Sequence, residues 1–551
     1  MTRIHNGLAD LCSRARSLFA QGRLCLLLLL SCAGNTAQSG DLTYEVTGST
    51  ITITRFSGLG GTAVIPGTID GMAVTAIGVW AFYKSIGLTN ITLPGTLTRI
   101  GYGAFRGCTG LTSLVLPGSV ASIGEYAFSD CAGLTSILLP EGVTSIGYGA
   151  FSGCTGLASL TLPGSVTSIA DYAFSDCAGL TSLTLPRTVT SIGHDAFDRC
   201  TGLVSVTVDA VAGGYRFSGL NRLKNVTIGN SVTSVGGFPN CTGLTSLTLP
   251  NSVTRIESAA FQGCTGLTNL TLPNGLTRLE DTTFQGCTGL TSLALPTSLI
   301  SIGGSAFRDC TGLASITLPN NVTSIGANAF ASCAGLTSIL LPDSVTNIGE
   351  IAFSYCAALT SIVLPKNLAS IPPYAFFGCS GLTSMALPNS LISIGDYALA
   401  GCSGLTSLTL PKSVTYLGNS AFGGCGGLTA IYFTGNAPSL GWWSPFSGAT
   451  SAVVYYLPGT TGWGSTFGDL PTKLWKAQMK GSGLGFGVLT NGFGFNLSGT
   501  GTLIVVVEAC TDLANPAWAA LGTNTLTRGA SPFRDPLWTN YPARFYRLRS
   551  P

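Results

Sequence analysis

Histidine is the first residue type to consider, because enzymes with a serine or cysteine nucleophile commonly place a histidine against it. The chain has only two histidines. His5 lies near the N-terminus, and His194 lies in the segment SIGHDAF, where neighbouring segments of the same form carry Tyr148 or Asp171-Tyr172. This variation indicates an outward position without a catalytic partner. The sequence therefore predicts a protein that is not an enzyme.

Cysteine is the most regularly spaced reactive residue. One cysteine recurs every 23 residues from Cys108 to Cys200, and again from Cys241 to Cys425. Zinc sites need short Cys-x-x-Cys pairs or Cys/His clusters, and this spacing supplies neither. Residues at one repeat position point the same way, which favours a ladder of small buried thiols. Disulfides between some adjacent rungs are the alternative, and no metal ion or cofactor is expected.

The carboxylates do not form a catalytic pair. Asp130 and Asp176 occupy the same position of the segment FSDC, two repeats apart. Two carboxylates that cleave a glycosidic bond need a cleft that holds the sugar, and a regular repeat offers none. Solvated loop charges are the favoured interpretation. The chain also has no GxxxxGK[ST] phosphate-binding loop, although it contains 74 glycines.

The elements that position these residues follow the 23-residue period. One unit, from Leu157 to Cys177, reads LASLTLPGSVTSIADYAFSDC. Its apolar residues form a strand, a return path and a helical turn or tight bend, in that order: Leu157, Leu160 and Leu162; Val166 and Ile169; Ala173 and Phe174. A unit of this size cannot bury these side chains alone, so the repeats must stack into a solenoid.

Composition and charge narrow the class of protein further. Charged residues make up 9% of the chain and the formal net charge is +3, so no basic surface for nucleic acid is expected. After the N-terminal segment, no apolar run reaches the roughly 18 residues of a membrane-spanning helix. A membrane is therefore expected as a partner only through a lipid anchor.

The outward positions of the predicted strands form a candidate ligand-binding face of hydroxyl and amide side chains. The alternative is a solvated surface without a ligand. The face comprises Ser159, Thr161, Ser182, Thr184, Ser246, Thr248, Asn269 and Thr271. Further candidate contact points are two arginines at one slot of the return path and three tryptophans near the end of the repeats: Arg255, Arg278, Trp442, Trp443 and Trp463. These tryptophans belong to an aromatic group that could instead cover the last repeat.

The N-terminus has the pattern of an export signal. Four arginines precede the apolar run Leu24–Leu30, which is too short to span a bilayer. The sequence LLSCAG around Cys32 resembles a bacterial lipobox, and the resemblance implies cleavage before Cys32 and lipidation of its thiol. Ordinary cleavage near Ala37 is the alternative. After cleavage before Cys32, residues 33 to 40 would form a flexible tether.

The repeat resembles a known family. The pattern C-x-x-L-x-x-L-x-L-P-x-x-V/L-x-x-I-G-x-x-A-F is similar to the BspA-type leucine-rich repeat of bacterial surface proteins. The resemblance covers about residues 44 to 475, including segments similar to that family's two caps. It implies a right-handed superhelix with a parallel β-sheet and a role in extracellular binding or adhesion. It does not imply a particular ligand.

Residues 476 to 551 leave the 23-residue register and predict a small all-β, sandwich-like domain. They resemble a C-terminal module of secreted bacterial proteins with a VE-x-x-TDL…W core and a terminal RFYR. The matching residues are Glu508, Thr511, Asp512, Leu513, Trp518 and Arg544 to Arg547. Attachment, packing and capping of the last repeat are the roles this module could have.

The sequence thus predicts five regions. They are a signal or lipoprotein leader with tether (1–40), an N-terminal cap (41–87), about 16 repeats with two shortened at 203–243 (88–430), a C-terminal cap (431–475) and the all-β module (476–551). The predicted function is binding of an extracellular protein or polysaccharide at the cell surface or after secretion. The alternative is a structural envelope or matrix protein without a specific ligand.

Overall fold

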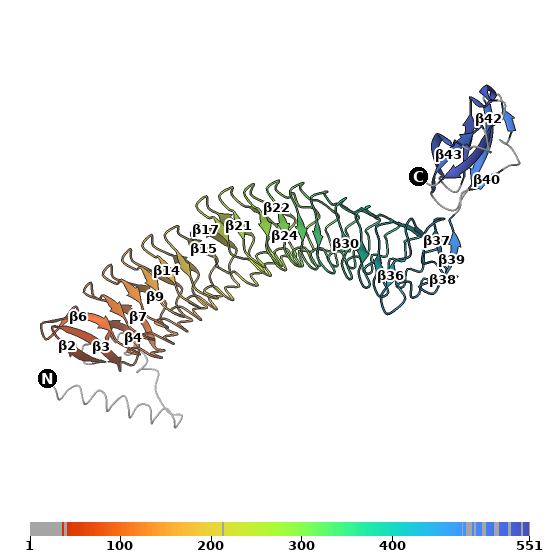
Figure 1. Cartoon of the computed structure of the whole chain (residues 1–551). Coiled ribbons are helices and arrows are strands. Elements are labelled where there is room, and N and C mark those ends of the chain that lie inside the picture. The colour runs from red at the N-terminus through yellow and green to blue at the C-terminus, as the bar shows by residue number, and fades with distance from the viewer. Residues whose placement is uncertain are drawn as a thin grey trace, which may run out of the picture. The chain divides into compact units, whose positions relative to one another are not determined.

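The computed structural model describes most of the chain after the leader. The described residues are 41–211, 214–475, 478–480, 487–489, 492–498, 503–511, 517–526, 530–541 and 544–549, with the backbone of Thr36–Ala37. The chain forms two compact units. Unit 1 comprises Met1–Thr277 and Gly286–Pro296, and unit 2 comprises Arg278–Gln285 and Thr297–Pro551. Figure 1 shows the strands of both units along the chain.

Unit 1 opens with an antiparallel hairpin of β2 (Leu42–Thr47) and β3 (Thr50–Phe56). Gly48 takes a φ of 61° in the two-residue turn, a conformation that glycine adopts without steric cost. β3 pairs in parallel with β6 (Met72–Ile77), which in turn pairs with the first repeat strand on that side. The other strands of this region are β1 (Thr36–Ala37), β4 (Gly61–Val64) and β5 (Thr68–Ile69).

Each repeat of unit 1 then contributes a front strand, after the Cys-x-x-Leu segment, and in most repeats a back strand, after the Leu-Pro turn. The front strands are β7 (Leu88–Thr92), β9 (Ser113–Val115), β11 (Ser136–Leu138), β13 (Ser159–Thr161), β15 (Ser182–Leu185), β17 (Ser205–Val208), β18 (Asn225–Ile228), β20 (Ser246–Thr248) and β22 (Asn269–Thr271). The back strands are β8 (Arg99–Ile100), β10 (Ser122–Ile123), β12 (Ser145–Ile146), β14 (Ser168–Ile169), β16 (Ser191–Ile192), β19 (Ser234–Val235) and β21 (Arg255–Ile256).

Unit 2 continues the same alternation. Its front strands are β25 (Ser315–Thr317), β27 (Ser338–Leu340), β29 (Ser361–Val363), β31 (Ser384–Ala386), β33 (Ser407–Leu410), β35 (Ala430–Phe433), β37 (Val453–Tyr456) and β39 (Leu470–Leu474), with β38 (Thr466–Phe467) antiparallel to β39. Its back strands are β23 (Arg278–Leu279), β24 (Ser301–Ile302), β26 (Ser324–Ile325), β28 (Asn347–Ile348), β30 (Ser370–Ile371), β32 (Ser393–Ile394), β34 (Tyr416–Leu417) and β36 (Ser439–Leu440).

The last part of unit 2 is antiparallel. One sheet contains β40 (Gln478–Lys480), β41 (Gly487–Leu489), β42 (Gly492–Ser498) and β45 (Ala530–Asp535). The other contains β43 (Leu503–Cys510), β44 (Ala519–Leu526) and β46 (Phe545–Arg549). Phe495 and Phe533 of the first sheet share a buried cluster with Val507 and Leu526 of the second, as in a β-sandwich.

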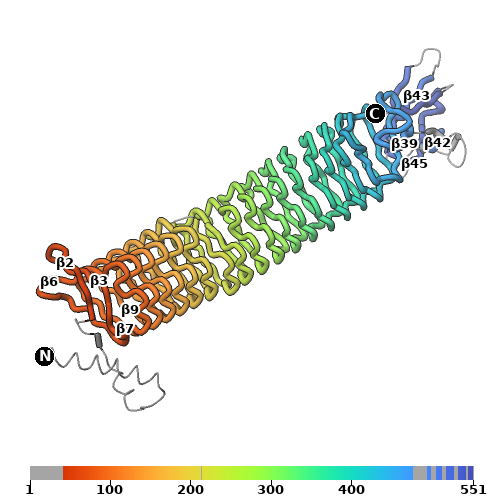
Figure 2. The backbone as a smooth tube through the Cα atoms, turned by 90° about the horizontal axis from the view of Figure 1, so that it is seen from below, coloured from red at the N-terminus to blue at the C-terminus, as the bar shows by residue number. Residues whose placement is uncertain are grey.

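Neighbouring repeats pair in parallel, one repeat apart. Ser136 of β11 lies opposite Ser159 of β13, and Ile146 of β12 lies opposite Ile169 of β14. Because the register equals the sequence period, every side chain meets its counterpart in the next repeat. Figure 2 shows the successive coils that result.

The core of each repeat is built from the residues that the period brings inside. In the unit from Leu157 to Cys177, the strand leucines, Val166, Ile169, Ala173, Phe174 and Cys177 are all at least 93% buried, and Phe174 is completely buried. The Phe174 ring stacks between Phe151 at 5.2 Å and Phe197 at 5.5 Å, measured between ring centroids. Stacking of identical rings therefore runs through the middle of unit 1.

The structure confirms the predicted parallel β-solenoid followed by a small all-β part. Ala173 and Phe174 lie in a tight turn, one of the two forms expected for this segment. A short 3-10 helix lies at Trp538–Asn540 in the C-terminal module. In most repeats a front strand, a back strand and a tight turn thus take the place of the helices that other repeat folds use.

Candidate binding surface

The predicted hydroxyl and amide face lies on the front strands of unit 1. All eight of its predicted residues are exposed, and the residue between each pair is buried, as the period-2 pattern requires. Ser159 lies opposite Ser182, and Thr248 lies opposite Thr271. The side chains therefore form aligned rows one repeat apart. Whether these rows bind a ligand stays a prediction.

Apolar residues interrupt the rows at two places. In unit 1, Val115 and Leu138 are 65% and 59% exposed and lie opposite each other. In unit 2, Leu340 and Val363 are 63% and 61% exposed and are also direct neighbours. Each pair places a small apolar patch within a polar surface, an arrangement that suits contact with a partner.

The pairing of the front strands of unit 1 is interrupted next to the shortened repeats. Strand pairing stops at β18 and resumes between β20 and β22. A hollow of about 380 Å³ lies at this interruption, lined by Lys224, Asn225 and Thr227 on one side and by Ser246 and Thr248 on the other. A second hollow of about 610 Å³ also includes Thr248 in its lining, together with the Leu249–Ser252 turn and Thr271. The predicted face is therefore not uniform, and three of its predicted residues, Ser246, Thr248 and Thr271, line the hollows.

The two predicted arginine contact points belong to different units. Arg255 lies exposed at the start of β21 in unit 1. Arg278 lies exposed at the start of β23 in unit 2, and its Nε atom is 3.1 Å from Oε2 of Glu280. Pairing with a neighbouring carboxylate reduces the charge that Arg278 offers to a ligand.

The structure separates the predicted aromatic group into exposed and packed members. Trp442 and Trp443 are 98% and 66% exposed. Trp463 is half-buried, stacks on Tyr456 at 5.2 Å and donates a hydrogen bond from Nε1 to Oγ1 of Thr460. Trp463 thus contributes to the C-terminal cap, whereas the adjacent pair Trp442 and Trp443 is free to contact a partner.

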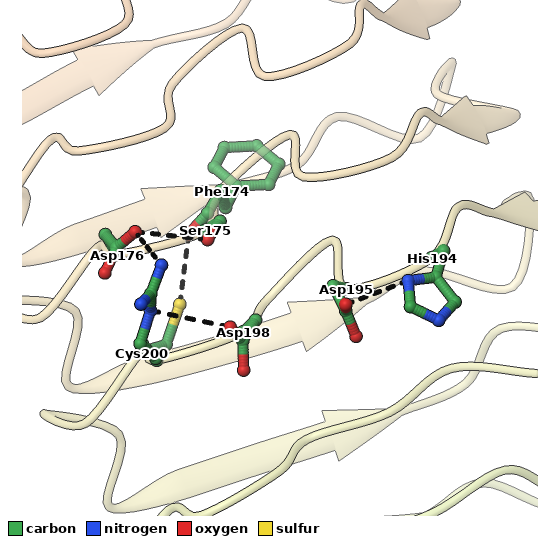
Figure 3. A network of polar contacts seen from close by, with 8 residues as sticks. Phe174, Ser175, Asp176, His194, Asp195, Asp198 and Cys200 are labelled. Carbon is green, nitrogen blue, oxygen red and sulfur yellow. Dashed lines mark hydrogen bonds and ion pairs between the residues drawn. The ribbon is translucent and has the colours of Figure 1, made fainter.

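His194 lies on the surface of unit 1 among carboxylates, as Figure 3 shows. Its side chain is 71% exposed, and Nδ1 is 2.8 Å from Oδ2 of Asp195. Its backbone N–H donates to Oδ1 of Asp171 in the preceding repeat. In the same region, Arg199 is paired with Asp176 at 2.8 Å. These are contacts within and between turns, and they fit the outward position expected for His194.

The repeat cysteines line the core. All fourteen are buried and carry free thiols. The Cys200 thiol donates a hydrogen bond to the carbonyl oxygen of Phe174, 26 residues earlier, and its counterparts repeat this bond along the chain. Burial raises the pKa of the Cys154 thiol to about 12. The thiols therefore act as small buried donors, the favoured of the two interpretations, rather than as nucleophiles.

Within the described residues, no group of three or more His, Cys, Asp or Glu side chains is arranged to hold a metal ion. No helix in that part of the chain is long and apolar enough to cross a bilayer. The candidate lipidation site, Cys32, lies outside the described residues, as do Asp512 and Leu513 of the C-terminal motif.

The motif residues of the C-terminal module form ionic contacts. Arg547 and Arg549 of β46 each donate from Nε to one oxygen of Glu508 on β43, at 2.7 Å. These bonds hold the pKa of the Glu508 carboxyl below its usual range. Nε of Arg544 lies 2.9 Å from Asp535, and both side chains are largely buried. These ion pairs therefore connect β46 and the residue before it to the rest of the module.

Sequence analysis missed one surface feature of unit 1. Aromatic rings, one per repeat, lie in a row on the turn that precedes the buried phenylalanine: Trp80, Tyr102, Tyr126, Tyr148, Tyr172 and His194. The row was not recognised because its residues alternate between two sequence positions. The signal that could have revealed it is the alternation itself, with glycine after the ring in two of the repeats.

Comparison with known proteins identifies the family. The sequence model of the BspA type leucine rich repeat region, which comprises six copies of the repeat, matches residues 75–204, 236–360 and 346–452. These segments make up more than half of the chain. The protein therefore belongs to the BspA-type leucine-rich repeat family.

Solved structures of bacterial proteins resemble the chain. A leucine-rich repeat protein of Bacteroides ovatus is 26% identical, with 79% of this chain and 98% of that chain covered and a TM-score of 0.49. A leucine rich cell surface protein of Faecalibacterium prausnitzii is 28% identical over 73% and 95% of the two chains, with a TM-score of 0.33. The pneumococcal vaccine antigen PcpA is 22% identical over 73% and 94%, with a TM-score of 0.35. None of the curated proteins compared with the chain matches it significantly.

Proposed function

We propose that this leucine-rich repeat scaffold is exported and binds an extracellular protein or polysaccharide through the front strands of unit 1. The observation that carries the proposal is the aligned, exposed and uncharged face of serine, threonine and asparagine side chains on register-matched strands. A regular β-surface of this kind offers hydrogen-bonding groups at a constant spacing. Membership of the BspA-type family supports an interaction scaffold.

The hollows support a position for the ligand along the face. Thr248 lines both of them, and Thr271 lies directly opposite it on β22. Lys224 is the one charged residue in the lining of the smaller hollow, so a ligand there would meet mainly neutral polar groups. We place the centre of the binding face at β18, β20 and β22.

The test is binding of the purified chain to arrays of extracellular proteins and of polysaccharides at physiological salt. The double variant Thr248→Arg/Thr271→Arg should lose at least tenfold in affinity for any ligand found, because two charges and two long side chains then occupy the face. The matched control is Ser122→Arg/Ser191→Arg, which adds the same charges to exposed positions of the back strands.

The outcomes separate the two functions considered for the chain. Saturable binding that the front variant weakens and the back variant preserves supports the proposal. Absence of saturable binding to either array would favour a structural envelope or matrix protein instead. Binding that neither variant weakens would place the ligand elsewhere on the molecule, and equal losses in both would indicate a general effect of the added charges.

Export is a separate part of the proposal, supported by the arginine-rich leader and by the family. Lipidation of Cys32 would place the protein at the envelope. Expression in a bacterial host that processes lipoproteins, followed by detergent phase partition, tests it. The native chain should enter the detergent phase and Cys32→Ala should not. Equal partition of both chains would instead support ordinary cleavage near Ala37.

A further inference from the structure

The aromatic row of unit 1 is a continuous feature of six repeats. Successive ring centroids, from Trp80 through Tyr102, Tyr126, Tyr148 and Tyr172 to His194, are 5.0, 5.6, 5.2, 5.6 and 6.3 Å apart. The rings meet edge to face or tilted, which is a favourable arrangement for aromatic pairs. The row therefore has nearly the same spacing as the repeats themselves.

Two glycines make room for the row. Where the ring comes from the first of the two alternating positions, as in Tyr102 and Tyr148, the next residue is Gly103 or Gly149, both with left-handed φ values near 55°. A Cβ atom at Gly103 would collide with the Trp80 ring, and one at Gly149 would lie 2.8 Å from the Tyr126 ring. Each of these rings thus lies directly over the backbone of the next repeat.

The other rings occupy backbone that does not favour them. Trp80, Tyr126 and Tyr172 have φ values of 56°, 53° and 56°, in the left-handed region where glycine is preferred. Bulky side chains in this conformation reduce stability, and such residues often have a functional role. Glycine fills the same position in the two intervening repeats, at Gly103 and Gly149, so the fold itself does not demand a ring there.

The ends of the row are exposed, Tyr126, Tyr148 and Tyr172 in its middle are half-buried, and its surroundings are acidic. Trp80 and Tyr102 are each 37% exposed, and the His194 side chain is 71% exposed. Glu125 and Asp171 directly precede two of the tyrosines, and Asp195 contacts His194. The cation nearest the middle of the row, Arg106, lies over the Tyr126 ring and is paired with Asp130 at 3.1 Å.

We propose that this row binds a neutral polysaccharide chain, with sugar rings stacked on the aromatic side chains. The apolar C–H face of a sugar packs on an aromatic ring, and its hydroxyls donate to carboxylates such as Asp171 and Glu125. A row of similar contacts matches a polymer of similar units better than a globular partner. The acidic neighbours disfavour polyanionic chains by repulsion. The inference rests on the proposed role in extracellular binding and adds to the front-strand face a second binding site, on the turns of unit 1.

The experiment uses the full chain in native affinity gels. The gels contain a soluble neutral polysaccharide (xyloglucan, galactomannan or laminarin) or a polyanion (polygalacturonate or heparin). Retardation is expected in at least one neutral gel and in neither polyanion gel. The double variant Tyr102→Ala/Tyr148→Ala should lose at least tenfold in affinity for the neutral polysaccharide. The backbone is not left-handed at either of these two positions. Tyr102→Phe/Tyr148→Phe should retain most of the affinity, because the rings remain.

The control is Tyr416→Ala, which removes a tyrosine that is also 37% exposed but lies on β34 of unit 2 and is not part of the row. It should bind as the native chain does. Thermal unfolding followed by circular dichroism establishes that each variant is folded. A variant that fails to fold would be replaced by Tyr102→Ala or Tyr148→Ala alone.

Three results would overturn the inference. The first is that none of the neutral polysaccharides retards the native chain. The second is polysaccharide binding that the alanine variant retains in full. The third is a protein ligand, found on the arrays, whose binding requires the row. If the Thr248→Arg/Thr271→Arg variant alone loses ligand, the proposed function stands and the inference about the row fails. If the native chain binds no array component and no gel polysaccharide, both fail.

Discussion

Most repeats bury one phenylalanine ring against their neighbours, with Leu399 in its place in one repeat, and this residue carries much of the packing. Phe174 is fully buried and stacks on both sides. Phe174→Ala should destabilise the protein by about 3–5 kcal/mol, because the substitution removes apolar contacts and leaves a cavity that rigid neighbours cannot fill. Chemical denaturation followed by circular dichroism measures the change.

Thr161→Ala provides the control for Phe174→Ala. Thr161 lies in the same repeat but is exposed on β13. Its substitution should change the free energy of unfolding by no more than about 0.5 kcal/mol. Similar effects of the two substitutions would contradict the inward position of the ring.

At the scale of the element, the cysteine ladder predicts low reactivity. The Cys154 and Cys379 thiols have their pKa values raised to about 12, mainly by burial, and they lie in the core. Since the thiolate is the reactive form, a thiol reagent at mildly alkaline pH should leave the repeat cysteines unmodified in the native protein. After unfolding in guanidinium, the same reagent should modify all of them. Peptide mass spectrometry distinguishes the sites, and rapid labelling of the folded chain would refute the buried ladder.

The last strand of the C-terminal module has its own pH dependence. The pKa of Glu508 is lowered in the folded state by its bonds to Arg549 and Arg547. The stabilisation is therefore fully present above the unfolded-state pKa of a glutamate, about 4.3. It is lost as the pH falls through the folded-state value.

Proteolysis tests this pH dependence. Near neutral pH the native chain should resist loss of β46, and at strongly acidic pH an acid-stable protease should release it faster. Glu508→Gln should show rapid release at both pH values. Release that does not depend on pH in the native chain would mean that these ion pairs contribute little.

At the scale of the whole molecule, stability is expected to be the sum of repeats and of the interfaces between them. Deletion of residues 155–177 removes one full period and joins Cys154 to Ala178, which keeps every later side chain in its position. This deletion should preserve a cooperative thermal transition and lower its midpoint by a few degrees at most.

A deletion of residues 155–166 removes about half a period and provides the comparison. Core leucines would then meet turn residues of the next repeat, so the cooperative transition should be lost or shifted far down. Circular dichroism melting of both deletions measures this. Equal behaviour would mean that the register between repeats does not determine stability.

Much of this architecture was determined by the sequence itself. The 23-residue period, the alternation of Leu160 and Leu162 and the position of Phe174 predicted parallel strands, an inward ring and outward hydroxyls, and the structure has all three. The reason is that in a solenoid each contact is between residues one period apart. The sequence pattern within one repeat therefore also specifies which residues contact each other between repeats.

Only the tertiary structure decided the features that break the period. The hollow at β18 and β20 lies where the pairing of the front strands is interrupted, and the repeat pattern does not specify where strand pairing stops. The aromatic row needs left-handed turns that bring two alternating positions, such as Tyr102 and Tyr126, into one line. The contact of Arg547 with Glu508 joins residues 39 apart that follow no repeat. Such contacts depend on how the chain turns in space, which side-chain periodicity does not encode.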